Sequence, residues 1–355
     1  MKRSLSLCLS AAFLMCLLAD SAAAQSALLD IPRDSQHATV LQKIGITDIK
    51  VNYHRPLVKG RQVWGKLVPY DEVWRAGANE NTTISFSDPV NIEGKPLEAG
   101  TYGLHMIPGQ AEWTVIFSRN YSSWGAFTYK QDEDALRVTV KPQPAEFHEA
   151  LEYNFEEVKE NSATLTMSWD KLAVPIKVGV NTEPLVQASL HKQLRGFAQY
   201  TWDGWDDAAN YLLAHKLSMD DALNYCDRSI QVEERFDNLL TKSKVLTAMG
   251  RKTESDKTLT AALAKANAVQ MHSYARQLQI DGQAEKAFSI YRENAKKNPD
   301  SWIVHVGLGR MYSAQGDYAN AAKEMRAALA TAPEPNKAFL QNFVKRLDGK
   351  DDINK

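Results

Sequence analysis

The sequence predicts two different halves, an antiparallel β-sandwich or barrel-like domain followed by an α-helical solenoid. From about residue 36 to residue 180, hydrophobic and polar residues alternate, as in strands that bury one face. After about residue 182, hydrophobic residues recur at every third or fourth position, as in amphipathic helices. Towards the end of the chain, similar residues recur 34 positions apart, which is typical of stacked helix pairs. We therefore expect a multidomain chain, β then α.

The β half is expected to hold eight or more short strands with no convincing helix between them. Hydrophobic and polar residues alternate along Ile49–His54, which predicts a strand with one buried face. Tyr102–Met106 and Trp113–Phe117 flank a Pro108-Gly109 turn and predict a hairpin. Asn91–Leu97 predicts a tight turn between two short strands. Further strands are expected over Thr83–Phe86, Leu136–Val140, Leu151–Phe155, Ala163–Trp169 and Val174–Val180.

The helical half carries its clearest signal in residues spaced 34 apart. These pairs are Gly282 with Gly316, Ala287 with Ala321, Tyr291 with Met325, and Pro299 with Pro333. Glycine permits the left-handed turn between two helices, alanine permits close helix contact, and proline ends the second helix. Together with Leu308-Gly309 and Tyr312, these residues resemble the tetratricopeptide repeat. Degenerate pairs are expected around Trp205–Val232 and Leu239–Ala266, and a capping helix over Lys337–Leu347.

The first residues predict a cleavable signal peptide and therefore an exported, periplasmic or secreted protein. Lys2 and Arg3 precede an apolar run, and Ala22–Ala24 provides small residues for cleavage between Ala24 and Gln25. The apolar run is shorter than the roughly 20 residues that span a bilayer, so no membrane span is expected after cleavage. The predicted division is a signal peptide over 1–24, a β domain over 25–182, a linker or first helix over 183–200, and repeats with their cap over 201–350.

Charge and cysteine content exclude several classes of function. The formal net charge is −1, so there is no basic field for a nucleic acid or an anionic membrane. Removal of the leader leaves Cys226 as the single cysteine, which excludes an internal disulfide and multi-cysteine metal sites. Cys226 lies among apolar positions of an expected helix and is interpreted as a core residue.

A distinctive set of motifs runs through the β half. It comprises Asn52–Pro56, Lys59–Arg61, Trp64-Gly65, Val73–Glu80, Thr82-Thr83, Ala99–Leu104, Ile107–Gly109, Trp113–Phe117 and Ser123–Gly125. Over roughly residues 30 to 180 the chain resembles the bacterial family called domain of unknown function 2911. The resemblance implies a fold and a domain boundary, and it implies no activity.

Residues 55–80 combine arginines with aromatic residues, and they are the first candidate for a ligand site. The candidate side chains are Arg55, Arg61, Arg75, Asn79 and Glu80, with His105 and Trp124 added from later segments. Guanidinium groups beside aromatic rings bind carboxylates, phosphates or sugar hydroxyls, so a small molecule or a glycan is the expected ligand. The alternative is that Arg75 pairs with Glu80 or Asp71, and that Trp64 and Trp74 belong to the core.

No motif for metal binding or nucleophilic catalysis stands out. The histidines of the β half are not spaced two apart on one strand, and no HExxH helix or GxSxG elbow occurs. We interpret His37, His54, His105 and His148 as scattered surface or loop residues, and we expect no metal and no cofactor. A pair of carboxylates acting on a glycan stays open, since such a pair needs proximity only in space.

In the helical half, the repeat register predicts a peptide groove. His272, Arg276 and Arg310 are expected on the concave surface, and Arg276 and Arg310 are 34 residues apart. Two guanidinium groups on adjacent repeats could hold a carboxylate or an acidic peptide. The alternative is two solvated arginines whose stems cover apolar surface.

These features favour a binding and scaffold protein over an enzyme. The β domain would hold a small ligand or glycan, and the repeats would recruit a protein or peptide partner. The alternative is a cell-envelope hydrolase or lyase that acts on glycans or cell-wall material, for which the arginine–aromatic cluster and the histidines are the only support. A third reading is that the β half merely supports the repeats.

Overall fold

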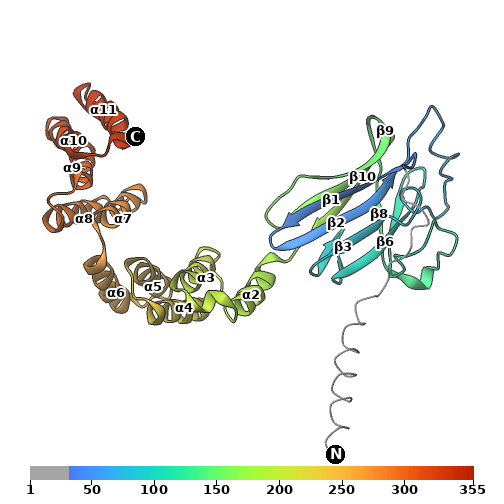
Figure 1. The fold of residues 1–355 in the computed structure, drawn as a ribbon, viewed down its shortest axis with the longest axis horizontal. Coiled ribbons are helices and arrows are strands. Elements are labelled where there is room, and N and C mark those ends of the chain that lie inside the picture. The colour runs from blue at the N-terminus through green and yellow to red at the C-terminus, as the bar shows by residue number, and fades with distance from the viewer. Residues whose placement is uncertain (1–31) are drawn as a thin grey trace, which may run out of the picture. The chain divides into compact units, whose positions relative to one another are not determined.

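The computed structural model describes residues 32–355, which divide into two compact units between Leu185 and Val186. The first unit is built of strands and the second of helices, which confirms the predicted order of β then α (Figure 1). The described strands form two open antiparallel sheets and no closed barrel. The predicted signal peptide and its cleavage site lie outside the described residues.

One sheet has six strands in the order β1-β2-β3-β6-β7-β8. Their bounds are β1 (Gln36–Ile44), β2 (Thr47–Arg55), β3 (Thr83–Phe86), β6 (Gly100–Ile107), β7 (Trp113–Ser118) and β8 (Asp134–Val140). A turn at Gly45-Ile46 joins β1 to β2 and pairs Ile44 with Thr47. Gly45 has φ +57°, a conformation that glycine adopts without strain. β6 and β7 form the hairpin predicted around Pro108-Gly109.

The second sheet has four strands in the order β5-β4-β10-β9. Their bounds are β4 (Val90–Ile92), β5 (Lys95–Leu97), β9 (Gln143–Glu156) and β10 (Ser162–Gly179). The prediction of separate strands over Ala163–Trp169 and Val174–Val180 was wrong, because β10 runs through both. Its register with β9 shifts between Ser168 and Leu172, and Asp170 has φ +56°. Such a bulge accommodates irregular residues without ending the strand.

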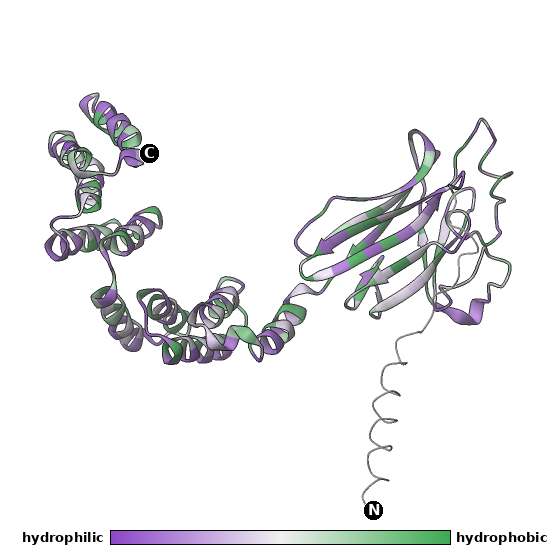
Figure 2. Cartoon of the chain, viewed as in Figure 1, coloured by the Kyte–Doolittle hydropathy of each residue, from purple (hydrophilic) through white to green (hydrophobic). Residues whose placement is uncertain are grey.

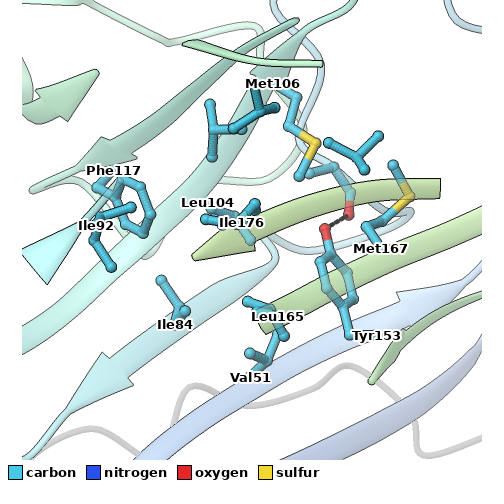
Figure 3. Close-up of a cluster of buried hydrophobic side chains, with 14 of the residues drawn as sticks. Val51, Ile84, Ile92, Leu104, Met106, Phe117, Tyr153, Leu165, Met167 and Ile176 are labelled. Carbon is cyan, nitrogen blue, oxygen red and sulfur yellow. Dashed lines mark hydrogen bonds between the residues drawn. The ribbon is translucent and has the colours of Figure 1, made fainter. Parts of the chain in front are cut away.

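The inner faces of the two sheets enclose one hydrophobic core, part of which is drawn in Figure 3. Along the strands, hydrophobic and hydrophilic residues alternate (Figure 2), so one face of each sheet is buried. Trp113 and Trp169 are fully buried, and the ring of Trp64 lies 4.8 Å and 5.7 Å from their rings. Trp74 packs against the same core and stacks on Trp169. The reading of Trp64 and Trp74 as core residues is therefore confirmed.

The second unit consists of helices that follow one another as antiparallel pairs (Figure 1). The helices are α2 (Thr182–Gln193), α3 (Trp202–Ala214), α4 (Met219–Val232), α5 (Phe236–Ala248), α6 (Lys252–Lys265), α7 (Ala268–Ile280), α8 (Ala284–Lys297), α9 (Trp302–Ala314), α10 (Tyr318–Thr331) and α11 (Glu334–Asp348). The α7–α8 and α9–α10 pairs repeat at 34 residues, since α7 begins at Ala268 and α9 at Trp302. Within residues 32–355, none of the helices combines the length and apolar character needed to cross a membrane.

Small residues and one lysine fix the contacts between successive helix pairs. A Cβ atom on Gly307 would lie 2.6 Å from the ring of Tyr291, and one on Gly309 would lie 2.7 Å from the end of Met325. Both glycines therefore permit α9 to approach its neighbours closely. The Nζ of Lys297, at the end of α8, donates to three carbonyl groups at the end of α6. A positive charge at a helix C-terminus is favourable.

Candidate functional site

The loop of residues 74–82 is fixed to the body of the β unit at its start. Trp74 exchanges two backbone hydrogen bonds of 2.8 Å with Met106 on β6. The indole Nε1 of Trp74 also donates to the carbonyl of Gly77 at 3.1 Å. Arg75 thus projects from backbone that is tied on both sides.

The next residue in the loop, Ala76, is held by two buried hydroxyl groups. Its carbonyl oxygen accepts hydrogen bonds from Thr82 Oγ1 at 3.0 Å and from Tyr153 Oη at 2.8 Å. Tyr153 itself lies within the core (Figure 3). Ala76 has φ +51°, a left-handed conformation that is uncommon for residues other than glycine and costs on the order of 1–2 kcal/mol. The two hydroxyls therefore stabilise a strained turn directly beside Arg75.

Arg75 is the candidate whose surroundings are most unusual. Its side chain is half-buried, and its buried Nε has no hydrogen-bond partner. Neither of the pairs considered from the sequence forms, and among residues 32–355 no carboxylate makes an ion pair with Arg75. Its guanidinium carbon lies 5.9 Å from the ring centre of Trp124, as in a cation–π contact. Burial lowers the pKa of the Arg75 guanidinium, yet arginine stays charged at ordinary pH.

Trp124 and Phe127 form an exposed aromatic pair next to this guanidinium. Their rings stack at 6.1 Å and 17°, with exposed fractions of 59% and 82%. Gly125 between them has φ +74°, and a Cβ there would meet the Phe127 ring at 2.8 Å. A backbone bridge between Trp124 and Glu80 joins this segment to the loop that carries Arg75. Two flat rings beside a cation are suited to a sugar or another planar ligand.

Glu80 is paired with side chains other than Arg75. Arg33 donates two hydrogen bonds to its carboxylate at 2.7 Å and 2.9 Å, and His54 Nε2 lies 3.5 Å from it. Burial alone would raise the pKa of Glu80, but the hydrogen bonds from Arg33 and the charges of His54 and Arg33 leave that pKa below its ordinary value. The ring of His37 lies 5.2 Å from that of His54, because the two residues face each other across β1 and β2.

The surroundings of His54 lower its pKa on balance. Burial lowers its pKa, and the positive charges of Arg33 and Arg75 act in the same direction, whereas Glu80 opposes them. A neutral imidazole beside a carboxylate can accept a proton. Glu80 was among the predicted site residues, but His54 was not. The turn at Gly45-Ile46 fixes the strand register and was the signal that could have placed His37 beside His54.

Three other predicted residues donate hydrogen bonds to backbone carbonyl groups and do not face the aromatic pair. Arg55 donates to the carbonyl of Leu151 at 2.9 Å and pairs with Glu152 at 3.2 Å. Arg61 donates to two carbonyls of its own turn. Asn79 donates to the carbonyl of Ser35 at 3.2 Å, and its φ of +57° suits an asparagine in a turn. The structure therefore brings together Arg75, Glu80 and Trp124, with Asn79 shaping the loop between them.

His105 is buried, with an exposed fraction of 2%, so its interpretation as a surface or loop residue was wrong. It lies on the face of β6 opposite the core residues Leu104 and Met106, as the alternation predicted. The segment after β7 covers this face, and the ring of Tyr129 lies 5.6 Å from His105. Burial lowers the pKa of His105, and its Nδ1 has no hydrogen-bond partner. Within residues 32–355, no group of three or more His, Cys, Asp or Glu side chains is arranged to hold a metal ion.

In the helical unit, two of the three predicted groove residues contact the end of the chain. Arg276 and Arg310 both donate to the side-chain oxygen of Asn354 at 3.4 Å. His272 is largely buried behind them, and burial together with the two guanidinium charges lowers its pKa to about 4. The surface that these residues were expected to leave open is thus occupied by residues 351–355.

A separate groove of about 1090 Å³ lies between the α5–α6 pair and α7. Its lining mixes apolar and polar side chains, and it includes Leu240, Val269 and Tyr274 beside Lys244 and Asp256. The volume is slightly above the roughly 300–1,000 Å³ typical of ligand pockets. None of His272, Arg276 and Arg310 lines it, and no motif in the sequence predicted this groove.

Comparison with known proteins bears on the β unit. No curated protein matches this chain. The segment over residues 35–178, which is the β-sandwich that carries Arg75 and Trp124, matches the family described as protein of unknown function (DUF2911).

Proposed function

We propose that this chain is an exported bacterial binding and scaffold protein. The β unit would bind a small anionic molecule or an acidic glycan, and the helical unit would bind a protein or peptide partner. The observation that carries the first part is the half-buried Arg75, whose guanidinium has no carboxylate partner among the described residues and lies beside an exposed aromatic pair. A carboxylate or phosphate placed there would supply the missing acceptor, and a sugar ring would stack on Trp124.

Tryptophan emission provides a direct test of the β site. The full-length mature chain is titrated with glucuronate, inorganic phosphate and neutral glucose. Glucuronate is expected to change the emission of Trp124, and Arg75→Lys is expected to weaken binding by about tenfold, because lysine lacks the planar fork. Arg292→Lys, an exposed arginine on α8, is the matched control. The proposal for this site fails if no anionic probe binds, or if the two variants lose affinity equally.

For the helical unit we propose stacked repeats of the tetratricopeptide type that bind a protein segment. The support is the 34-residue spacing of two helix pairs and the groove of about 1090 Å³ beside α7. A photoreactive residue in place of Ser273, within that groove, should crosslink a partner in cells. The same residue in place of Lys257, outside the groove lining, should not. Equal labelling at both positions would argue against a specific groove.

Export is part of the same proposal, and it rests on Lys2, Arg3 and the alanines before Gln25. N-terminal sequencing of the protein from the cell envelope or medium should begin at Gln25. An intact N-terminus on protein retained in the cytoplasm would contradict it.

A second candidate function is a hydrolase or lyase that acts on glycans or cell-wall material. The observation that favours it is the His54–Glu80 pair, 3.5 Å apart, in which His54 lies on β2 and Glu80 in the same loop as Arg75. A neutral His54 could take a proton from a sugar hydroxyl or a ring carbon. If the protein releases reducing ends from cell-wall fragments and His54→Gln abolishes this release, catalysis is the main activity in place of binding. Intact fragments after prolonged incubation would leave the binding proposal in place.

A further inference from the structure

The last residues of the chain fold back onto the helical unit. After α11 the chain turns at Gly349 and Lys350, and Lys350 has φ +59°. Residues 351–355, which we call the tail, then lie against α9. Ile353 is only 3% exposed and belongs to the core cluster of α9, α10 and α11. The tail is therefore bound as a peptide would be, with one apolar anchor.

Polar contacts fix the tail on both sides of this anchor. Ser313 on α9 accepts a hydrogen bond from the backbone N of Ile353 at 3.1 Å and donates to Asp352 Oδ1 at 2.8 Å. Asn354 donates through Nδ2 to the carbonyl of Arg310 at 3.0 Å. The recognised pattern is thus an acidic residue, an aliphatic residue and an amide residue in succession.

The two guanidinium groups under the tail make no ion pair with it, although the charge of Asp352 acts on Arg310. Arg276 on α7 and Arg310 on α9 lie side by side, and the side-chain group that both contact is the neutral amide oxygen of Asn354. Among the described residues neither guanidinium makes an ion pair, and Asp352 is engaged by Ser313 and Asn354. The Nε of Arg310 is buried without a partner. Arg310 also donates to the carbonyl of Ile353 at 3.4 Å, and Arg276 to the amide oxygen of Gln279 at 3.3 Å. Two guanidiniums whose acceptors are all neutral favour an occupant that carries a carboxylate at the position of Asn354.

We propose that the surface formed by α7, α9 and α11 is a binding site for an acidic peptide segment, and that the tail occupies it as a weak internal competitor. The partner segment carries an acidic residue, an aliphatic residue and a second acidic residue, the last in the place of Asn354. This inference rests on the proposed peptide-binding role of the helical unit and locates that role at Arg276 and Arg310.

The test uses two labelled peptides and the full-length mature chain. One peptide copies residues 348–355, and the other has aspartate in place of Asn354. Ile353→Glu places a charge in the apolar anchor site and should release the tail. This variant is expected to bind the aspartate peptide at least tenfold more tightly than the unaltered chain does, and at least tenfold more tightly than it binds the asparagine peptide. Fluorescence anisotropy measures both affinities.

A second variant acts in the opposite direction. Asn354→Asp puts the carboxylate into the tail itself, so it should raise the melting temperature of the helical unit and block the aspartate peptide. When added to the Ile353→Glu variant, in which the tail is released, Arg276→Lys should weaken binding of the aspartate peptide, whereas Arg292→Lys should not. The inference is overturned if the released chain retains its helical circular dichroism but binds neither peptide, if it binds both equally, or if Asn354→Asp lowers the melting temperature.

These outcomes separate this inference from the proposed function as a whole. Glucuronate binding at Arg75 and crosslinking from position 273 do not involve the tail. If both persist while the peptides fail to bind, the site under the tail is a structural cap and the binding function lies elsewhere. If the peptides bind while both others fail, this site is the functional one.

Discussion

The carbonyl oxygen of Ala76 accepts two hydrogen bonds in the interior of the β unit, and this arrangement makes a quantitative prediction. Thr82→Val and Tyr153→Phe each remove one donor with little change of shape. In either single variant the carbonyl keeps one partner, so each should lower the free energy of unfolding by about 1 kcal/mol. Thr139→Val, at an exposed position of β8, is the matched control and should stay within about 0.5 kcal/mol.

The double variant should lose more than the sum of the two single losses. With both hydroxyls removed, the buried carbonyl has no donor, and leaving such a group unsatisfied costs about 1–3 kcal/mol. Ala76 is 0% exposed, so water does not replace the donors without opening the loop. We therefore expect a total loss of about 3–4 kcal/mol and a coupling of at least about 1 kcal/mol between the two sites.

Hydrogen exchange of amides in β10 measures this loss for the β unit separately from the helices, because core amides exchange by unfolding of their own unit. Tryptophan emission in the same samples reports whether Arg75 keeps its contact with Trp124. Strict additivity of the two single losses would show that the two hydroxyls do not share one acceptor in solution. The claim that they stabilise a strained turn would then fail.

Three further predictions concern the helical unit. Gly307→Ala should lower the free energy of unfolding by about 1–3 kcal/mol, because the added methyl group meets a rigid aromatic ring. Gly309→Ala should be nearly neutral, because the facing methionine can move. Thermal unfolding of the two variants shows which one is less stable. Lys297→Met should lower stability by about 1 kcal/mol, and Lys296→Met, its exposed neighbour, should have no effect. His272, whose pKa is near 4 in the folded chain against an ordinary 6.5, binds a proton more readily when unfolded. The helical unit should therefore lose stability as the pH falls from about 6.5 to 4, and His272→Gln should flatten this dependence in urea titrations.

The sequence predicted most of the fold because its signals were local. Alternation along β2 and the hairpin at Pro108-Gly109 depend on neighbouring residues, and so does the change to helical spacing near residue 182. The errors arose where a distant segment decides the outcome. The long β10 stays one strand because β9 pairs with it on both sides of the bulge at Asp170. His105 is buried because the chain after β7 returns over β6, which no local pattern encodes.

The sequence predicted the region of the candidate site, but it did not predict the role of each residue within it. Arginine has the same five donors wherever it occurs, so composition could not separate Arg55 and Arg61 from Arg75. These arginines differ in the group that accepts their hydrogen bonds. Arg55 bonds to the backbone carbonyl of Leu151 on a distant strand, and Arg61 bonds to two carbonyls of its own turn. Neither choice of acceptor can be read from composition. The same limit applies in the helical unit, where the 34-residue spacing placed Arg276 and Arg310 together but could not reveal that the tail covers them.

The two candidate sites share one physical feature, a guanidinium that the fold buries in part without giving it a carboxylate. Burying a charge without a partner is unfavourable, so a fold keeps such a group only if other interactions offset it. At Arg75 the offset is an aromatic ring and a loop fixed by two buried hydrogen bonds and one part-buried hydrogen bond. At Arg310 it is the ring of Phe343 and two neutral oxygens, those of the Asn354 amide and the Ile353 carbonyl. Both guanidiniums are thus positioned by contacts that leave their strongest mode of bonding unused, and an anionic ligand would stabilise either unit by supplying it.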